Sequence, residues 1–132
     1  WRFGQLAVPY MEQAGYDSIV NITTMGSINR GPNMSAYASS KAALNHMTAN
    51  LAMDFGPDVR IDAVGPGAVE TQALASVLTP EIEKKMLEHT PIKRLGEIEE
   101  SAGAVRVFAA PIVSWITGQV LFVNGGGVQT LD

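Results

Sequence analysis

The chain has 132 residues, a net charge of −4, 46% hydrophobic residues and 17% charged residues. This length suits one domain with a packed core, and the acidic balance gives no electrostatic reason to expect nucleic acid or an anionic membrane as a partner. The absence of cysteine excludes disulfides, thiolate nucleophiles and cysteine-ligated zinc. With no apolar run of membrane-spanning length and no signal peptide, the sequence predicts a cytoplasmic protein.

The first half of the sequence predicts a helix, a strand and a longer helix. Residues 2–14 are expected to form a helix that ends at Gly15. The short run SIVNITT, residues 18–24, is apolar and rich in β-branched residues, which favours a buried strand. After a loop at 25–33, apolar residues recur at helical spacing over 35–55, which predicts the second helix.

The second half continues the alternation. Residues 59–64 predict a strand that the Gly-Pro-Gly sequence at 65–67 should end. At 79–80, threonine followed by proline is the expected start of a helix, with threonine as the N-cap. Residues 97–110 predict another helix with an acidic first turn, and residues 119–127 predict a last strand that runs into a glycine turn.

This order of elements indicates an α/β fold with a parallel sheet, organised as one domain over residues 1–132. The carboxyl ends of parallel strands meet at one edge of a sheet, here called the carboxyl edge, and ligands bind there in open α/β sheets. His46 and His89 have no partners at ligand spacing, so no metal site is expected.

Tyr37 and Lys41 are four residues apart in the second predicted helix and therefore share one of its faces. A cation close to a phenol favours the phenolate, so the pair suits proton transfer to or from a hydroxyl or carbonyl oxygen. The same spacing arises by chance on many helices. Two surface residues without a catalytic role are therefore the alternative.

Further polar features are expected at the same edge of the sheet. Thr24 falls at the end of the first strand, residues 65–67 fall at the end of the second, and the helix with Tyr37 starts from that edge. This convergence favours the catalytic interpretation, with the hydroxyl of Thr24 holding the reacting oxygen. Ser27, Ser39 and Ser40 are the other candidate hydroxyls.

These motifs together resemble the second half of a short-chain dehydrogenase/reductase. The sequence YASSK, preceded by IVNITTMGS and followed by VGPGAVET, places Tyr37 and Lys41 in that family's Tyr-x-x-x-Lys motif. Thr24 stands at the position of the usual catalytic serine. Pro66, Gly67 and Thr71 match the Pro-Gly motif and the threonine that follows it. The resemblance covers essentially the whole chain, and the combination is far more specific than any one motif.

The resemblance implies hydride transfer between NAD or NADP and a secondary alcohol or ketone, with a hydroxysteroid or bile acid among the candidate substrates. Tyr37 would exchange a proton with the substrate oxygen, which Thr24 would orient. Lys41 would favour the phenolate form of Tyr37 and, with Tyr37, bind the nicotinamide ribose. The segment 66–71 would hold the nicotinamide, with the backbone of Val69 reaching its carboxamide.

The sequence departs from the family in three ways. Thr24 adds a methyl group to the serine position and restricts its rotamers, so reduced activity is expected. Asp62 and Gly65 replace the more usual asparagine and small residue, and Asp62 is expected to contact backbone or solvent without a catalytic role. The third departure is that the family's first half is missing, and with it the Gly-rich cofactor loop and a catalytic asparagine.

We therefore expect an incomplete Rossmann-type domain: the later half of a doubly wound sheet, with three parallel strands and flanking helices. Such a chain by itself should turn over little or no substrate, because it cannot grip the cofactor pyrophosphate. The first strand would be a bare apolar edge, which indicates a fragment of a longer protein or self-association. The start of the chain at Trp1 favours a true N-terminus elsewhere.

The family resemblance also implies a homo-oligomer, a dimer or tetramer, built through helices 2–14 and 35–55 and the C-terminal strand. This leaves a second functional hypothesis open. The chain could serve as a non-catalytic oligomerisation or interaction module that keeps the assembly surfaces of the family.

Overall fold

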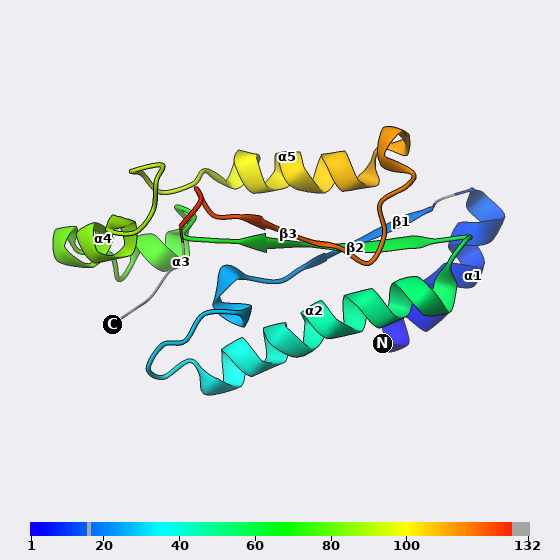
Figure 1. Cartoon of the computed structure of the whole chain (residues 1–132), viewed down its shortest axis with the longest axis horizontal. Helices are drawn as coiled ribbons and strands as arrows, with labels where there is room; N and C mark the ends of the chain where they lie inside the picture. The colour runs from blue at the N-terminus through cyan, green and yellow to red at the C-terminus, as the bar shows by residue number, and fades with distance from the viewer. Residues whose placement is uncertain (16, 128–132) are drawn as a thin grey trace.

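The computed structural model describes residues 1–15 and 17–127. Three parallel strands form one sheet in the order β1-β2-β3 between two helical layers (Figure 1). Helix α5 covers one face of the sheet, and α1 and α2 cover the other. The strands are β1 (Ser18–Ile22), β2 (Arg60–Pro66) and β3 (Val120–Val123). The helices are α1 (Arg2–Ala14), α2 (Ser35–Phe55), α3 (Gln72–Ala75), α4 (Pro80–Leu87) and α5 (Ile98–Ala109), with 3₁₀ turns η1 (Met25–Ser27) and η2 (Pro111–Val113).

The main core lies between the sheet and the layer formed by α1 and α2. Val59, directly before the central strand, and Ile61, near its start, pack with Val8 of α1 and with Leu51 and Ala52 of α2. A strand that is paired on both sides and covered on both faces is buried nearly throughout, which explains the apolar run that β2 contains. Each large aliphatic side chain buried in this way stabilises the fold by about 1.5–3 kcal/mol.

The expected fold class and helix positions are confirmed. Helix α1 spans residues 2–14 and ends at Gly15, whose φ of 74° is the left-handed conformation that glycine adopts without a steric cost. Thr79 caps α4 by accepting a hydrogen bond from the Ile82 N–H over 3.3 Å, and Pro80 is the first helical residue. Helix α5 is one residue shorter at each end than expected.

The boundaries of all three strands differ from the expected ones. Strand β1 ends at Ile22 instead of residue 24, because the Thr24 hydroxyl accepts the Gly26 N–H over 3.2 Å and begins η1. Strand β2 continues through Pro66 instead of ending at 64, because Gly65 and Pro66 pair with Phe122 and Val123 of β3. The Gly-Pro-Gly sequence thus belongs partly to the sheet.

Strand β3 covers only Val120–Val123, and not 119–127. Gly125 and Gly126 have φ values of 65° and 79°, so the chain turns directly after the strand, and the expected glycine turn is confirmed. The short helix α3 was not expected. Its N-cap is Thr71, whose hydroxyl accepts the Leu74 N–H over 3.2 Å.

Asp62 lies in the middle of β2 and is fully buried. Its carboxylate accepts the Gln119 N–H over 2.9 Å, which confirms the expected backbone contact and fixes the residue before β3. Burial raises the pKa of the Asp62 carboxyl, and the Gln119 hydrogen bond and the Arg60 charge, 3.8 Å away, oppose that rise. Asp62 therefore anchors the sheet, at some electrostatic cost.

Candidate active site at the carboxyl edge of the sheet

The helix that carries Tyr37 and Lys41 is attached to the end of β1. The Lys41 ammonium donates a hydrogen bond to the Ile22 carbonyl oxygen over 2.9 Å, and Ile22 is the last residue of that strand. Tyr37 lies one helical turn before Lys41 on α2, and its side chain is 47% exposed. The expected pair is therefore placed at the carboxyl edge with the phenol open to an approaching molecule.

Thr24 joins the end of β1 to the end of β2. Its hydroxyl donates to the Pro66 carbonyl oxygen over 3.5 Å, which is long for a hydroxyl hydrogen bond. The proton of Ser27 is used on the Thr24 carbonyl oxygen at 2.6 Å, and that of Ser40 on the Tyr37 carbonyl oxygen at 2.7 Å. Among these three hydroxyls, Thr24 has the least engaged proton and is best able to donate to a ligand oxygen.

The end of the third strand forms hydrogen bonds with the segments that follow β1 and β2 at the same edge. The Asn124 side-chain amide donates to Met25 Sδ over 3.1 Å and to the Gly127 carbonyl oxygen over 2.6 Å. The Gly67 N–H donates to the Val123 carbonyl oxygen over 2.9 Å. The ends of all three strands are thus tied together around the positions where Thr24, Lys41 and Pro66 were expected to meet.

The segment after β2 is held by one short backbone bridge. Gly96 donates its N–H to the Ala68 carbonyl oxygen and accepts the Glu70 N–H, both over 2.9 Å, which makes Val69 and Gly96 a parallel bridge pair. In such a bridge Gly96 forms its hydrogen bonds with the residues before and after Val69, and not with Val69 itself. The N–H and carbonyl of Val69 itself therefore face away from Gly96.

A pocket of about 120 Å³ lies on the α5 side of this segment, and sequence reasoning did not anticipate it. Neither Tyr37 nor Lys41 lines it. The Ser101 hydroxyl is buried there without a hydrogen-bond partner among the described residues. Its walls include Val69, Leu87, Ile92, Ser101 and Val123.

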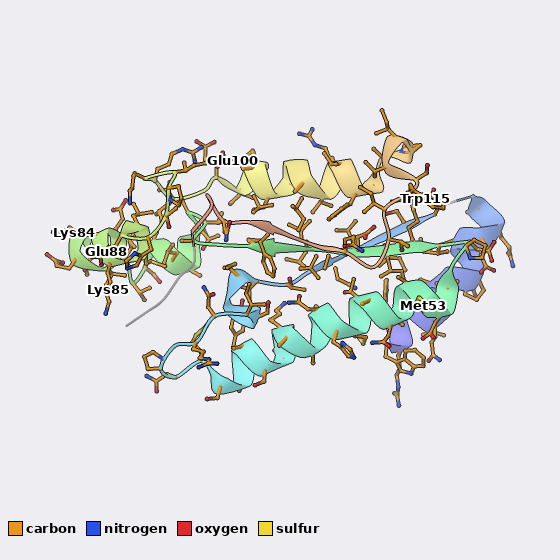
Figure 2. The ribbon with its side chains drawn as sticks, in the orientation of Figure 1. Met53, Lys84, Lys85, Glu88, Glu100 and Trp115 are labelled. Atoms are coloured by element: carbon orange, nitrogen blue, oxygen red, sulfur yellow. The ribbon has the colours of Figure 1, made fainter. Side chains whose placement is uncertain are left out.

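An ion pair at the start of α5 supports the residues that hold Val69. The Arg94 guanidinium donates to both oxygens of Glu100, over 2.8 and 2.7 Å, and the Glu97 N–H also donates to Glu100 over 2.8 Å. Glu100 stands at the beginning of α5 in Figure 2. The acidic residues at 97–100 predicted only the start of a helix. An arginine shortly before a helix N-terminus with glutamate at its third position was the available signal.

Glu100→Gln is expected to destabilise the fold at neutral pH by an amount that disappears in acid. The Arg94 hydrogen bonds, the Glu97 N–H and the Arg94 charge lower the pKa of Glu100 from 4.5 to about 2. A lowered pKa in the folded state adds stability above pH 4.5 that is lost as the pH falls through 2. Solvent screening of this exposed pair keeps the effect small.

Urea unfolding of the parent and of Glu100→Gln between pH 7 and pH 2 measures this effect. The two midpoints should converge toward pH 2. Glu99→Gln is the matched control, because it removes a carboxylate from the same helical turn without removing the partner of Arg94. A constant difference between the parent and Glu100→Gln at every pH would show that the ion pair contributes nothing.

Two absences concern the described part of the chain. Within residues 1–15 and 17–127, no three His, Asp or Glu side chains are grouped so that they could hold a metal ion. None of the helices described there is long and apolar enough to span a bilayer.

A parallel sheet between helical layers, with a polar site at its carboxyl edge, defines a Rossmann-type α/β protein. The family model described as enoyl-(acyl carrier protein) reductase matches residues 1–127. The chain is 48% identical over 133 residues to 7α-hydroxysteroid dehydrogenase of Escherichia coli K12, covering 100% of this chain and 52% of that protein. It is 38% identical over 121 residues to the protein of the same name from Clostridium sardiniense, covering 91% and 46% of the two chains.

Solved structures agree with the sequence comparison. A 7α-hydroxysteroid dehydrogenase complexed with NADH and 7-oxo glycochenodeoxycholic acid superimposes with a TM-score of 0.91 at 49% identity, covering 98% of this chain and 51% of that one. A protein described as a member of the short-chain dehydrogenase/reductase family gives a TM-score of 0.82 at 36% identity, covering 94% and 51%. The chain belongs to the short-chain dehydrogenase/reductase family, as the sequence motifs predicted. It spans about half the length of the curated relatives it matches.

Proposed function

We propose that this chain carries the catalytic pair of an oxidoreductase that transfers a hydride between NAD or NADP and a secondary alcohol or ketone. The observation that carries the proposal is the attachment of Lys41 to the last carbonyl of β1, one helical turn from an accessible Tyr37. This contact sets the Tyr-Lys face of α2 at the edge where Thr24 and Pro66 meet.

The residues at this edge fit a nicotinamide cofactor. An ammonium has three N–H donors, and the contact with Ile22 occupies one of those of Lys41, which leaves two for ribose hydroxyls. The N–H and carbonyl of Val69, turned away from Gly96, can pair with a carboxamide. Gly67 and Thr71, at the two sides of Val69, complete the segment that would hold the nicotinamide. When bound, the cofactor supplies or accepts the hydride.

The residues of this chain transfer the proton and orient the substrate. Tyr37 passes its phenolic proton to the ketone oxygen during reduction and takes it back during alcohol oxidation. Lys41 favours the phenolate that forms when the proton leaves, since a nearby cation stabilises an anion. Thr24 donates its weakly engaged hydroxyl proton to the same substrate oxygen and keeps that oxygen facing Tyr37.

The 48% identity to 7α-hydroxysteroid dehydrogenase supports a hydroxysteroid or bile acid as the substrate. The test uses the polypeptide with any residues that its gene encodes before Trp1, beside residues 1–132 alone. Each is mixed with NAD⁺ or NADP⁺ and with 7α-hydroxy bile acids or simple secondary alcohols, and reduced nicotinamide is measured. Turnover of the bile acids supports the proposal. No turnover of any alcohol with either cofactor would favour a non-catalytic interaction module.

We also propose that copies of the chain associate through exposed apolar side chains. Phe3 on α1 is 80% exposed, and Met53 on α2 and Trp115 beyond α5 are likewise exposed (Figure 2). Exposed large apolar side chains are candidate interaction sites; Phe3 and Met53 belong to the α1–α2 layer, whereas Trp115 lies on the α5 side of the sheet. Phe3→Ser is expected to shift the sedimentation of the protein toward smaller species. Val77→Ser, also exposed but outside these helices, is the control, and equal sedimentation of both variants and the parent would contradict this surface.

A further inference from the structure

A short hydrogen-bond path runs from the backbone of Thr24 to helix α2. The Ser27 hydroxyl donates to the Thr24 carbonyl oxygen over 2.6 Å, and the Asn45 side-chain N–H donates to the Ser27 oxygen over 2.6 Å. The Thr24 hydroxyl itself makes only longer contacts, 3.2 Å from the Gly26 nitrogen and 3.5 Å to the Pro66 oxygen. The tightest side-chain contacts around Thr24 therefore lead to Asn45.

The number of available protons fixes the direction of this path. A serine hydroxyl has one proton, and a carbonyl oxygen can only accept, so the Ser27 proton is used on Thr24. Asn45 must then be the donor to Ser27. A carboxylate at position 45 has no proton to give, and it would compete with the Thr24 carbonyl for the proton of Ser27. Position 45 thus requires a donor.

Asn45 shares a helix face with the Tyr-Lys pair. Tyr37, Lys41 and Asn45 follow one another at intervals of four residues on α2, which places them along one side of the helix. Lys41 contacts the end of β1 at Ile22, and Asn45 contacts the next turn of chain at Ser27. Two successive helical turns therefore set the position of this face relative to the segment that contains Thr24.

We propose that Asn45 is a positioning residue that holds Thr24, through Ser27, at a fixed place relative to Tyr37. The inference rests on the proposed function of Thr24 and adds to it a specific side chain that does not touch substrate or cofactor. A carboxylate at position 45 draws the Ser27 proton away from the Thr24 carbonyl, and the turn η1 that starts at Thr24 loosens.

The first test is amide hydrogen exchange on the 132-residue chain. The N–H groups of Gly26 and Ser27 bond to the side chain and the carbonyl of Thr24, so their exchange reports how firmly that residue is held. In Asn45→Asp both amides should exchange about five- to tenfold faster, while those of β2 stay as protected as in the parent. Equal exchange in Asn45→Asp and the parent would overturn the proposal.

The chain offers a matched control on the same helix. Asn50 also donates its side-chain N–H over 2.9 Å, to the His46 carbonyl oxygen of α2 itself, and it is exposed. Asn50→Asp changes the same chemical group without touching η1, so exchange at Gly26 should not change. Faster exchange at Gly26 in both variants would show a general effect of charge on α2 and would overturn the specific role of Asn45.

Ser27→Ala removes the hydrogen bond to the Thr24 carbonyl oxygen directly, so it tests the proposal even if Asn45→Asp does not fold. It should speed exchange at Gly26 to the same extent, and Asn45→Asp in the Ser27→Ala background should add nothing further. A clear additional effect in the double variant would mean that Asn45 acts by another path, which contradicts the proposal.

Kinetics separate this inference from the proposed function. In the form of the protein that turns over, Asn45→Asp should lower kcat about tenfold and leave the KM for the cofactor unchanged, because only the substrate oxygen loses its orientation. An unchanged kcat would overturn the positioning role. Failure of the parent to turn over any alcohol counts against the proposed function, and the exchange pattern at Gly26 then decides alone whether Asn45 holds Thr24.

Discussion

Tyr37→Phe should lower turnover by about a thousandfold in the form of the protein that oxidises or reduces the proposed substrate. The change removes only the phenolic oxygen, and positioned acid/base groups typically contribute between a hundredfold and ten-thousandfold. Because the ring remains in place on α2, the urea midpoint should change little. Steady-state rates at saturating substrate and cofactor measure the loss.

Tyr10→Phe is the matched control for that experiment. Tyr10 is exposed on α1, and the variant removes the same oxygen at a position outside the proposed site. Its turnover should equal that of the parent. If Tyr37→Phe kept more than about a tenth of the parent rate, Tyr37 would not be the acid/base group, and the simpler interpretation of two surface residues on one helix face would be correct.

Gly67→Ala should destabilise the fold by about 1–3 kcal/mol, the usual range for forcing an extra carbon into a packed site. An added Cβ would lie 2.8 Å from both the Cα and the Cβ of Asn124. Neither atom can move by a change of rotamer, so the backbone of the segment after β2 or of the end of β3 must shift. The hydrogen bond from Gly67 to the Val123 carbonyl oxygen, 2.9 Å long, should weaken with it.

Gly103→Ala is the control for Gly67→Ala, and its effect should have the opposite sign. Gly103 lies inside α5, and an added Cβ there meets no atom within 4 Å. Alanine favours the helix over glycine by about 0.5–1 kcal/mol, so this variant should be more stable than the parent. Urea midpoints of both variants measure the difference. Equal stability of Gly67→Ala and the parent would mean that the two strand ends can separate without cost.

The sequence predicted the helices better than the strand ends, for a physical reason. Gly15 and Thr79 end and begin their helices through contacts within a few residues, and such local chemistry is visible in the sequence. The end of β2 depends on Phe122 and Val123, more than fifty residues away in the chain. Nothing near Gly65 indicates that pairing, so the predicted end of the strand at residue 64 was wrong.

In the candidate site, too, local features could be predicted from the sequence and contacts between distant segments could not. The interval between Tyr37 and Lys41 follows from helical geometry, and the sequence placed both residues on one face. The contacts of Lys41 with Ile22, of Asn45 with Ser27 and of Gly96 with the residues around Val69 join segments that are distant in sequence. Residue types gave no sign of the last two contacts, because Asn, Ser and Gly occur in many loops and helices without such roles.

The sequence by itself determined the family, the alternation of helices and strands, and the residues available for proton transfer. The alternation follows from composition and periodicity, and the proton-transfer pair from a spacing of four residues, whereas the family follows from the resemblance of several motifs over essentially the whole chain. Only the tertiary structure decided where β2 ends, how Thr24 is held, and which backbone groups of Val69 are turned outward. Those features depend on hydrogen bonds and side-chain contacts between segments that packing alone brings together, and their partners have no fixed separation along the chain.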